Sequence, residues 1–326
     1  MSRTLERLSP PASEYAAVSE DAGLLDRSQR GKLALSGPDA APFLDSVLSN
    51  DIAALTPGHG ADATLLTHKG RMLAEVRVLK TEEELLLDTE RVALQALFDA
   101  LHQFAIGYSA ELHKRTLEVT LLSAIGPGAD RLFAQAPAAE ELSHVASEVA
   151  GRSVRLVRTR LGVDVLCEAG DLDAVWAGLL AAGALPIGEA TFECVRIEAG
   201  IPLYGVEMDE TTMPQEAGIN KRAVSYSKGC YIGQETVARL YWKGKPNRLL
   251  RGLRFSDPVE SGAPLRQNER DVGSVASITA SPRFGLIGLA LVRQEVEPGD
   301  ILAVGDTSAA ATVVELPFHP TSAEHG

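Results

Sequence analysis

The pattern of apolar and turn-forming residues changes near residue 247, and this change constrains the fold more than any other feature. From residue 249 onward, short apolar stretches alternate with clusters of Gly, Pro, Asp and Ser, as in FGLIGLALV (284–292) and AATVVEL (310–316). Short strands separated by turn residues are typical of a small antiparallel barrel or sandwich. We therefore expect a C-terminal β-barrel over residues 248–326, with the boundary in the basic stretch KGKPNR (243–248).

The first 247 residues mix the periods of strands and helices. Expected strands cover 31–36, 63–67, 72–79, 84–88, 111–126, 153–158 and 163–168. Expected helices cover 38–48, 89–104, 172–182 and 189–199. Strand pairs interleaved with helices predict an α+β architecture and not a regular parallel sheet.

The composition places the chain among globular proteins and excludes several other classes. Apolar residues make up 45% and charged residues 23% of 326 residues, so the chain can bury a core. The formal net charge of −13 argues against direct binding of nucleic acid or of anionic membranes. No apolar run approaches the roughly 20 residues that cross a bilayer, and the first residues lack a signal-peptide pattern.

The three cysteines indicate a reducing environment. Cys167, Cys194 and Cys230 are far apart, and no CxxC or Cys/His pair has the spacing of metal ligands. We therefore expect no disulfide framework, no metal site and a cytoplasmic location.

One segment, YSKGCYIGQET (226–236), stands out because the usual nucleotide, hydrolase and metalloprotease motifs are missing. Two glycines flank Cys230 directly before a helical pattern. A thiol near a helix N-terminus and two residues from Lys228 lies in a positive potential that stabilises a thiolate. The alternative is a glycine-flanked turn with an inert cysteine. Local chemistry leaves both interpretations open.

A second segment, FECVRIEAGIP (192–202), places Glu198 at the expected C-terminus of a helix. The helix dipole disfavours a carboxylate there, so this residue is either a solvated glutamate or a ligand contact. Gly200 and Pro202 are ordinary signals for the end of a helix.

Several stretches together resemble the YgfZ family of folate-binding proteins, which are relatives of the glycine-cleavage T-protein (the aminomethyltransferase) and of mitochondrial iron–sulfur assembly factors. The most specific stretch is KGCYIGQE (228–235), the signature of that family. The other stretches follow in the same order along most of the chain: SGPDAAPFLDSVLSNDIAAL (36–55), THKGRMLAEVRVL (67–79), RIEAGIPLYG (196–205), MPQEAGI (213–219) and ARLYWKGKPNRLLRGL (238–253).

The resemblance implies an α+β fold in which two interleaved ferredoxin-like domains and a C-terminal antiparallel β-barrel form a ring around a central channel. Residues 1–247 would form the folate-binding region, with its second subdomain over roughly residues 52–110, and residues 248–326 the barrel. Tetrahydrofolate or a derivative is the expected cofactor. The expected partners are iron–sulfur enzymes, including tRNA-modifying ones, or their assembly proteins, with Cys230 and Lys228 as the functional pair.

The resemblance also implies folate contacts. One carboxylate can accept both the ring N–H and the exocyclic amino group of a pterin, and Glu198 matches the T-protein glutamate that does so. Of two aromatic contacts, the later matches Phe192, which would stack on a flat ring. The earlier falls at Arg30, which would stack or pair with a folate carboxylate. Three other arginines are candidates for the glutamate tail: Arg222, Arg239 and Arg248.

One departure from the T-protein separates two functions. Aligning KGRMLAEV with the glycine-rich turn of that enzyme puts Leu73 and Ala74 at an aspartate pair, one of which is its catalytic acid. Glu75 lies one place along, which on a strand points to the opposite face. We therefore expect a folate-binding accessory protein for assembly or repair of iron–sulfur enzymes. The alternatives are an aminomethyltransferase that uses Glu75, and a folate-responsive module whose Cys230 is structural.

Overall fold

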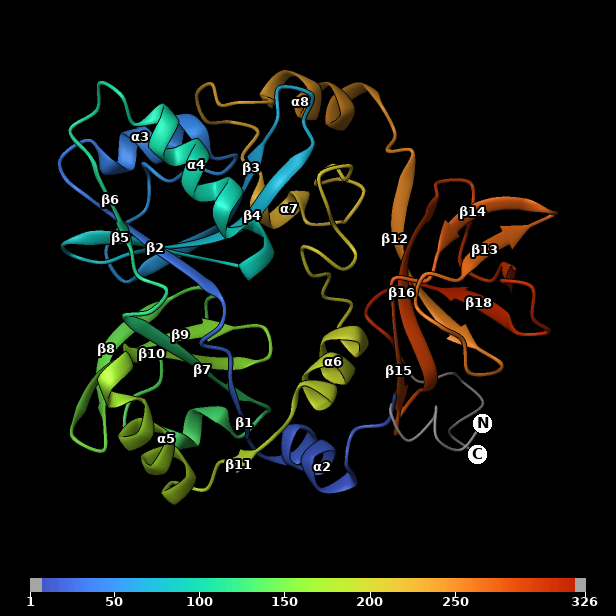
Figure 1. Cartoon of the computed structure of the whole chain (residues 1–326), viewed down its shortest axis with the longest axis horizontal. Helices are drawn as coiled ribbons and strands as arrows, with labels where there is room; N and C mark the ends of the chain where they lie inside the picture. Colours follow the sequence, from blue (N-terminus) through green and yellow to red (C-terminus); the bar gives the residue numbers. More distant parts are fainter. Residues whose placement is uncertain (1–7, 320–326) are drawn as a thin grey trace.

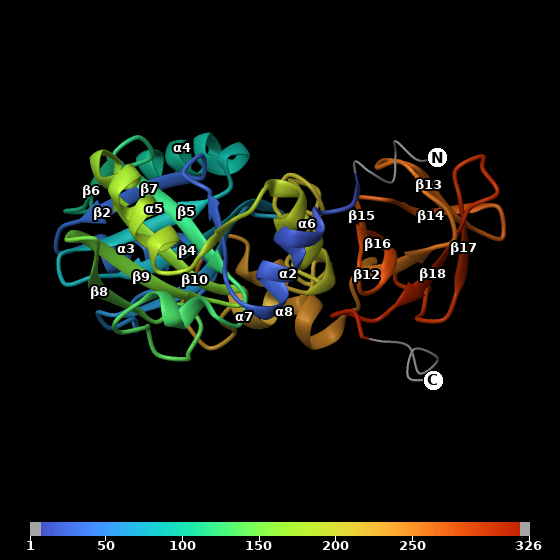
Figure 2. The ribbon, with the colours of Figure 1, turned by 90° about the horizontal axis from the view of Figure 1, so that it is seen from below.

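Three β-sheets organise residues 8–319, which are the residues that the computed structural model describes (Figure 1). Two α+β units, coloured blue to green, lie on one side, and the C-terminal barrel, in orange and red, lies on the other. Helix α6 lies between them in both views (Figures 1 and 2). The expected α+β fold with a C-terminal antiparallel barrel is confirmed.

The five-stranded sheet uses the chain from residue 31 to residue 114. In spatial order its antiparallel strands are β3 (His59–Leu66), β4 (Met72–Lys80), β5 (Glu84–Thr89), β2 (Gly31–Ser36) and β6 (Glu111–Lys114). Helices α3 (Ala40–Val47) and α4 (Leu94–Phe104) bury apolar residues such as Phe43 and Leu97 against it. This sheet also contains β2 and β6, which pair with each other and lie outside residues 52–110, so the subdomain expected over roughly 52–110 stays a prediction.

The six-stranded sheet is built from segments on both sides of the five-stranded one. In spatial order its strands are β11 (Leu185–Pro186), β1 (Gly23–Asp26), β7 (Val119–Ile125), β10 (Gly162–Glu168), β9 (Arg152–Thr159) and β8 (His144–Val149). Helix α5 (Leu172–Ala181) packs on it through Val175 and Leu179. Since β1 precedes and β7 follows the five-stranded sheet, the two units are interleaved along the chain.

The expected long strand over 111–126 is two strands. Strand β6 pairs with β2 in the five-stranded sheet, whereas β7 pairs with β1 and β10 in the six-stranded sheet. The chain crosses from one sheet to the other between them. A continuous apolar pattern does not reveal such a crossing, because either sheet would bury the same residues.

The barrel closes on itself. Its six strands, in spatial order, are β12 (Arg248–Phe255), β18 (Ala310–Val314), β17 (Ile301–Val304), β13 (Pro264–Gln267), β14 (Arg270–Ser274) and β16 (Gly285–Arg293), and β16 pairs with β12. Strand β15 (Ser277–Ser281) extends the sheet beside β16. Closure leaves the six barrel strands without an open edge. We propose the domain boundary between residues 247 and 248, where β12 begins.

Four further helices connect the units: α2 (Ala12–Glu20), α6 (Glu189–Glu198), α7 (Asn220–Ala223) and α8 (Gln234–Lys243). Helix α6 touches α2 on one side and strands β15 and β16 of the barrel on the other. No helix within residues 8–319 is long and apolar enough to span a membrane.

Candidate functional site

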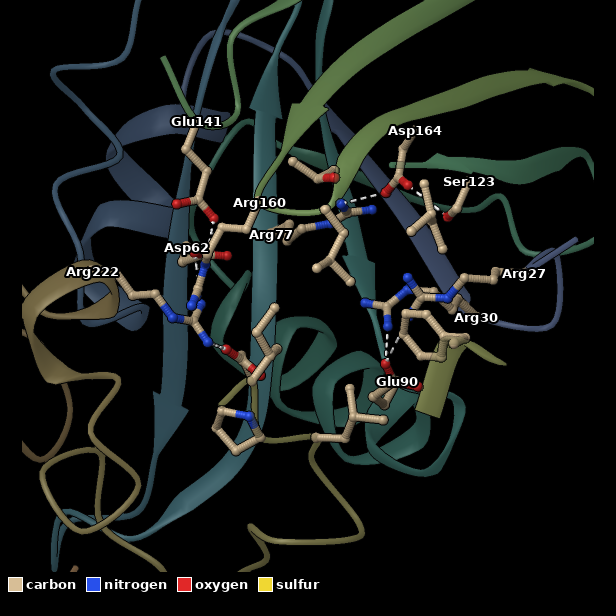
Figure 3. Close-up of a pocket in the computed structure, with 18 residues that line it drawn as sticks. Arg27, Arg30, Asp62, Arg77, Glu90, Ser123, Glu141, Arg160, Asp164 and Arg222 are labelled. Carbon is tan, nitrogen blue, oxygen red and sulfur yellow. Dashed lines mark hydrogen bonds and ion pairs between the residues drawn. The ribbon is translucent and has the colours of Figure 1, made fainter. Parts of the chain in front are cut away.

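A cavity lies where the two α+β sheets meet α6 and the segment after it (Figure 3). The space between its walls, counted together with the part that is open to solvent, is about 780 Å³. Its charged and polar lining residues are Arg27, Arg30, Asp62, Glu75, Arg77, Glu90, Ser123, Glu141, Thr159, Arg160, Asp164 and Arg222. Its apolar lining residues are Ile125, Leu161, Phe192, Ile201, Pro202 and Leu203.

Strand β4 turns two charged side chains into this cavity. Met72 and Ala74 are buried in the core of the five-stranded unit, whereas Glu75 and Arg77 alternate with them and line the cavity. Glu75 therefore points away from Ala74, as its position on a strand predicts. The face that it reaches is the cavity itself, so the lack of a carboxylate at Ala74 does not leave the cavity without one.

At one end of the cavity, Arg222 holds two carboxylates (Figure 3). Its Nη1 lies 2.7 Å from Oδ2 of Asp62, and its Nη2 donates a hydrogen bond to Oε1 of Glu75. Burial alone would lower the pKa of Arg222, but Glu75 and Asp62 outweigh burial and raise it. The ion pair fixes the Glu75 carboxylate at the cavity wall.

The other end contains a buried network of arginines around Asp88. This carboxylate accepts hydrogen bonds from Nε of Arg30 at 2.8 Å and from Nε of Arg77 at 2.7 Å. Burial would raise the pKa of Asp88, but Arg30 and Arg77 hold it well below its usual range. Nη1 of Arg77 also lies 2.6 Å from Asp164.

Arg30 lines the cavity, but its guanidinium is already hydrogen-bonded to carboxylates of the protein. Its Nε and Nη2 donate to Asp88, and its Nη1 donates to Oε1 of Glu90. All three nitrogen atoms therefore have carboxylate partners. The folate contact that the resemblance implies for Arg30 stays a prediction, and it would require Arg30 to give up one of these bonds.

Phe192, on α6, also lines the cavity, although a cation covers one face of its ring. The guanidinium carbon of Arg27 lies 4.3 Å from the ring centroid. A pterin would have to displace Arg27 to stack on that face. The stacking contact implied for Phe192 stays a prediction, while its observed neighbour is an arginine.

Glu198 lies on the same helix as Phe192 but outside the set of residues that line the cavity. The two positions differ by about 240° around the helix axis. Oε1 of Glu198 accepts hydrogen bonds from the Tyr15 hydroxyl of α2 at 2.9 Å and from the Ser281 hydroxyl of β15 at 2.5 Å. The Cys194 thiol lies one turn before Glu198 on α6, and burial together with the Glu198 carboxylate raises its pKa to about 12. Glu198 thus joins α2, α6 and the barrel, and its pterin contact stays a prediction.

Replacing Glu198 with alanine should lower the free energy of unfolding by about 2 kcal/mol, because the Tyr15 and Ser281 hydroxyls lose their common acceptor. Urea denaturation followed by circular dichroism measures this. The matched control is Glu189→Ala on the exposed first turn of the same helix, which should change the free energy by less than about 0.5 kcal/mol. Equal stability of Glu198→Ala and wild type would show that the hydrogen bonds of Tyr15 and Ser281 to Glu198 do not stabilise the fold.

Lys228 is bound to the end of α3. Its ammonium donates hydrogen bonds to the carbonyls of Leu48 at 3.1 Å and Asn50 at 2.7 Å, and also to the carbonyl of Asp45. Its Nζ lies 3.0 Å from Oδ1 of Asp45. Burial lowers the pKa of Lys228, although Asp45 opposes this. A cation that binds the last carbonyls of a helix satisfies groups that the helix cannot pair itself.

Cys230 is exposed, whereas Cys167 and Cys194 are buried. The loop that carries it turns at Gly233, where φ is +84° and a Cβ would lie 2.5 Å from the Thr67 carbonyl oxygen. The Lys228 ammonium donates hydrogen bonds to the end of α3 and to Asn50, and it lies 5.4 Å from the centroid of the Tyr231 ring. None of its described contacts is with the thiol. The functional pairing of Cys230 with Lys228 stays a prediction.

Of the three arginines considered for a glutamate tail, the structure brings one to the cavity. Arg222 lines it. Arg248 instead lies 3.2 Å from the buried Glu216, and Arg239 is exposed on α8.

Sequence reasoning missed several cavity residues, among them Arg27, Arg77 and Asp164. One signal was available for Arg77: in MLAEVRV (72–78), charged residues alternate with apolar ones, which indicates a strand with one polar face. No local signal was available for Arg27, because the pairing of β1 with β7 brings it to the cavity.

Two interleaved α+β units, a closed barrel and a charged cavity between the units define the glycine cleavage T-protein type of molecule. The GCVT N-terminal domain matches residues 8–228, and the glycine cleavage T-protein C-terminal barrel domain matches residues 248–319. The chain therefore belongs to the glycine cleavage T-protein (GCVT) family.

Several similar proteins are named aminomethyltransferase. The chain is 30% identical over 324 residues to an aminomethyltransferase of Rubrobacter xylanophilus, covering 94% of this chain and 86% of that protein. It is 30% identical over 328 residues to an aminomethyltransferase of Listeria welshimeri, covering 94% and 89%. The crystal structure of the glycine cleavage system aminomethyltransferase T from Bartonella henselae superposes with a TM-score of 0.83 at 25% identity, covering 94% of this chain and 88% of that one.

Proposed function

We propose that the protein binds tetrahydrofolate in the cavity and catalyses a one-carbon transfer of the aminomethyltransferase type. The observation that carries this proposal is the Glu75 carboxylate, which faces the cavity between the two α+β sheets. The relatives named aminomethyltransferase support it, because they match this chain over nearly its whole length. The function expected from the sequence, an iron–sulfur accessory role, is the second candidate.

The cavity has the properties that a folate requires. It combines apolar lining residues with polar and charged groups that converge on one space, as sites for small molecules do. Apolar residues Ile201, Pro202 and Leu203 provide a surface for flat rings, while arginines provide positive charge for the tail. Tetrahydrofolate, when bound, supplies secondary amines that accept a one-carbon unit.

Glu75 is the residue that we assign to proton transfer. A positioned carboxylate can take a proton from an amine or return one, and such catalysis contributes typically about 10²–10⁴-fold to a rate. Arg222 fixes the orientation of the carboxylate and leaves it at the wall of the cavity. The hydrogen bond of Arg222 to Glu75 and its ion pair with Asp62 make Arg222 a positioning residue.

The first test is calorimetric titration of the purified protein with tetrahydrofolate, together with an assay for methylenetetrahydrofolate formed from an amine donor. We expect micromolar binding and turnover. Binding without turnover would remove the transferase assignment and leave a folate-binding protein. If tetrahydrofolate does not bind, both the transferase assignment and the folate-binding assignment are wrong.

A second candidate function rests on a different observation, the exposure of Cys230 in the KGC motif. Membership of the YgfZ subfamily would make the protein a folate-binding accessory factor for assembly or repair of iron–sulfur enzymes. Cys230 would then act as a nucleophile or as a transient ligand, and a partner or a small thiol would supply the other ligands that a cluster needs. A cytoplasmic, reducing location fits this role.

The variant Cys230→Ser separates the two candidates. If the accessory role is correct, cells with this variant should lose activity of an iron–sulfur enzyme, while the purified variant binds tetrahydrofolate as wild type does. If the transferase role is correct, the purified variant should keep its turnover. A variant that supports the iron–sulfur enzyme fully would exclude the accessory role for this thiol.

A further inference from the structure

The five arginines that line the cavity differ in how well they are paired. Arg30, Arg77 and Arg222 each donate hydrogen bonds to carboxylates, and Nε of Arg160 lies 3.0 Å from Oε1 of Glu141. Arg27 is the exception. Within residues 8–319 it has one ion pair, from Nη2 to Oε1 of Glu90, and the distance of 3.6 Å is longer than a hydrogen bond.

The Glu90 carboxylate, which Arg27 approaches, is already hydrogen-bonded to another arginine. The same Oε1 of Glu90 accepts a hydrogen bond from Nη1 of Arg30. Among residues 8–319, no side chain accepts a hydrogen bond from the Arg27 guanidinium. This group therefore lines the cavity with its donors available to a ligand.

The surroundings of Arg27 favour an incoming anion. Burial, and after it the neighbouring cation Arg30, lower the pKa of Arg27 to about 10. Asp88 and Asp164 act in the opposite direction without cancelling this effect. With this pKa the guanidinium remains charged at neutral pH, and among the described residues no carboxylate accepts a hydrogen bond from it.

Phe192 holds this guanidinium in place. With the guanidinium carbon 4.3 Å from the ring centroid, the cation lies over the face of the ring. A carboxylate binds the edge of a guanidinium with two parallel hydrogen bonds. The contact with Phe192 therefore limits the positions that the guanidinium can take toward an anion.

We propose that Arg27, supported by Phe192, forms the carboxylate-binding subsite of the cavity and recognises the glutamate tail of folate. This inference rests on the proposed binding of folate, and it differs from the roles expected from the sequence, in which Arg30 meets a carboxylate and Phe192 stacks on the pterin. Arg27 is the binding residue, and Phe192 is a positioning residue that acts through it.

The subsite orients the ligand. Arg27 and Glu90 lie at one end of the cavity, and Arg222 with Asp62 lies at the other (Figure 3). A tail held at Arg27 directs the pterin half toward the end where Arg222 holds Glu75. The reacting amines are then on the side of the cavity that contains the proton-transfer carboxylate.

The test compares ligands with and without the tail charge. The probes are 5-formyltetrahydrofolate, its dimethyl ester, in which both carboxylates are neutral, and N-(4-aminobenzoyl)-L-glutamate, which is the tail half alone. Wild type should bind the free acid at least about tenfold more tightly than the ester. Arg27→Gln should weaken binding of the acid by about ten- to hundredfold, lose the tail fragment, and leave the affinity for the ester within about twofold.

Two variants complete the design. Phe192→Leu should weaken binding of the acid several-fold but not binding of the ester, and the double variant Arg27→Gln/Phe192→Leu should lose no more than Arg27→Gln alone. Arg131→Gln removes the same charge from the exposed surface and should leave all three affinities unchanged. Thermal unfolding checks that each variant is folded.

The outcomes distinguish this inference from the proposed function. If wild type binds the ester as tightly as the acid, the subsite is wrong while folate binding stands; this comparison needs no variant. If Arg27→Gln weakens binding of the acid and the ester equally, Arg27 does not bind the carboxylates of the tail. If wild type binds the tail fragment through Arg27 but not the whole folate, the subsite stands and the folate proposal falls. If wild type binds none of the three probes, both are wrong.

Discussion

Replacing Glu75 with glutamine should reduce the rate of methylenetetrahydrofolate formation at least about a hundredfold, with the affinity for tetrahydrofolate changed by less than about threefold. Glutamine keeps the size of the side chain and can still accept a hydrogen bond from Arg222, but it cannot exchange a proton. The change therefore removes the proposed chemistry and leaves the cavity wall intact. Steady-state turnover and calorimetric titration measure the two quantities separately.

The matched control is Asp62→Asn, which removes the other carboxylate held by Arg222 and leaves Glu75 in place. We expect a smaller loss of turnover, about tenfold or less, because this change affects the position of Glu75 and not its ability to carry a proton. A Glu75→Gln protein that turns over as fast as wild type would exclude Glu75 from the reaction. Equal losses in both variants would assign the effect to Arg222.

Replacing Lys228 with methionine should lower the free energy of unfolding by about 3 kcal/mol. Only 2% of this side chain is exposed, and its ammonium serves the carbonyls of Leu48 and Asn50 together with Asp45. Methionine fills the space but removes the donor to these carbonyls, and it leaves the Asp45 carboxylate with the backbone amides of Ile52 and Ala53 and without its cation. Urea denaturation followed by circular dichroism measures the loss.

The same variant tests whether Lys228 activates the neighbouring thiol. Cys230 is the exposed cysteine of the chain, so alkylation of the native protein by iodoacetamide reports on this thiol. We expect an alkylation rate within about twofold of wild type, because the ammonium is bound to the end of α3. Lys221→Met, on the exposed surface nearby in the chain, is the control for loss of charge. Wild-type stability combined with slow alkylation would make Lys228 a functional partner of Cys230.

The fold was largely predictable because its signals are local. The change in the pattern of apolar and turn-forming residues near residue 247, and the strand and helix periods before it, indicate an α+β region followed by a barrel. The structure has both. The pairing of segments was not predictable in this way. Whether the chain stays in one sheet or crosses to another at residues 115–118 depends on partners far along the sequence.

The candidate site was only partly predictable, for a related reason. Residue types in a motif identify candidates such as Glu198 and Lys228, but they do not say which way a side chain points. Glu198 faces the barrel and Lys228 faces α3. Arg27, which has no motif, reaches the cavity because β1 pairs with β7. Charge pairing between distant residues then decides which arginine is left for a ligand.

The insertion of one sheet into the other has a consequence for folding kinetics. Pairing β1 with β7 requires the chain to close a long loop, and the entropy of loop closure slows the formation of such distant contacts. The five-stranded sheet removes most of this cost, because its first and last strands, β2 and β6, are antiparallel neighbours, with Leu33 opposite Lys114. Once this sheet has formed, it brings the two ends of the loop together as a tight turn would. The six-stranded sheet can then nucleate on contacts that are effectively local, so we expect the two units to fold in a fixed order, with the inserted one first.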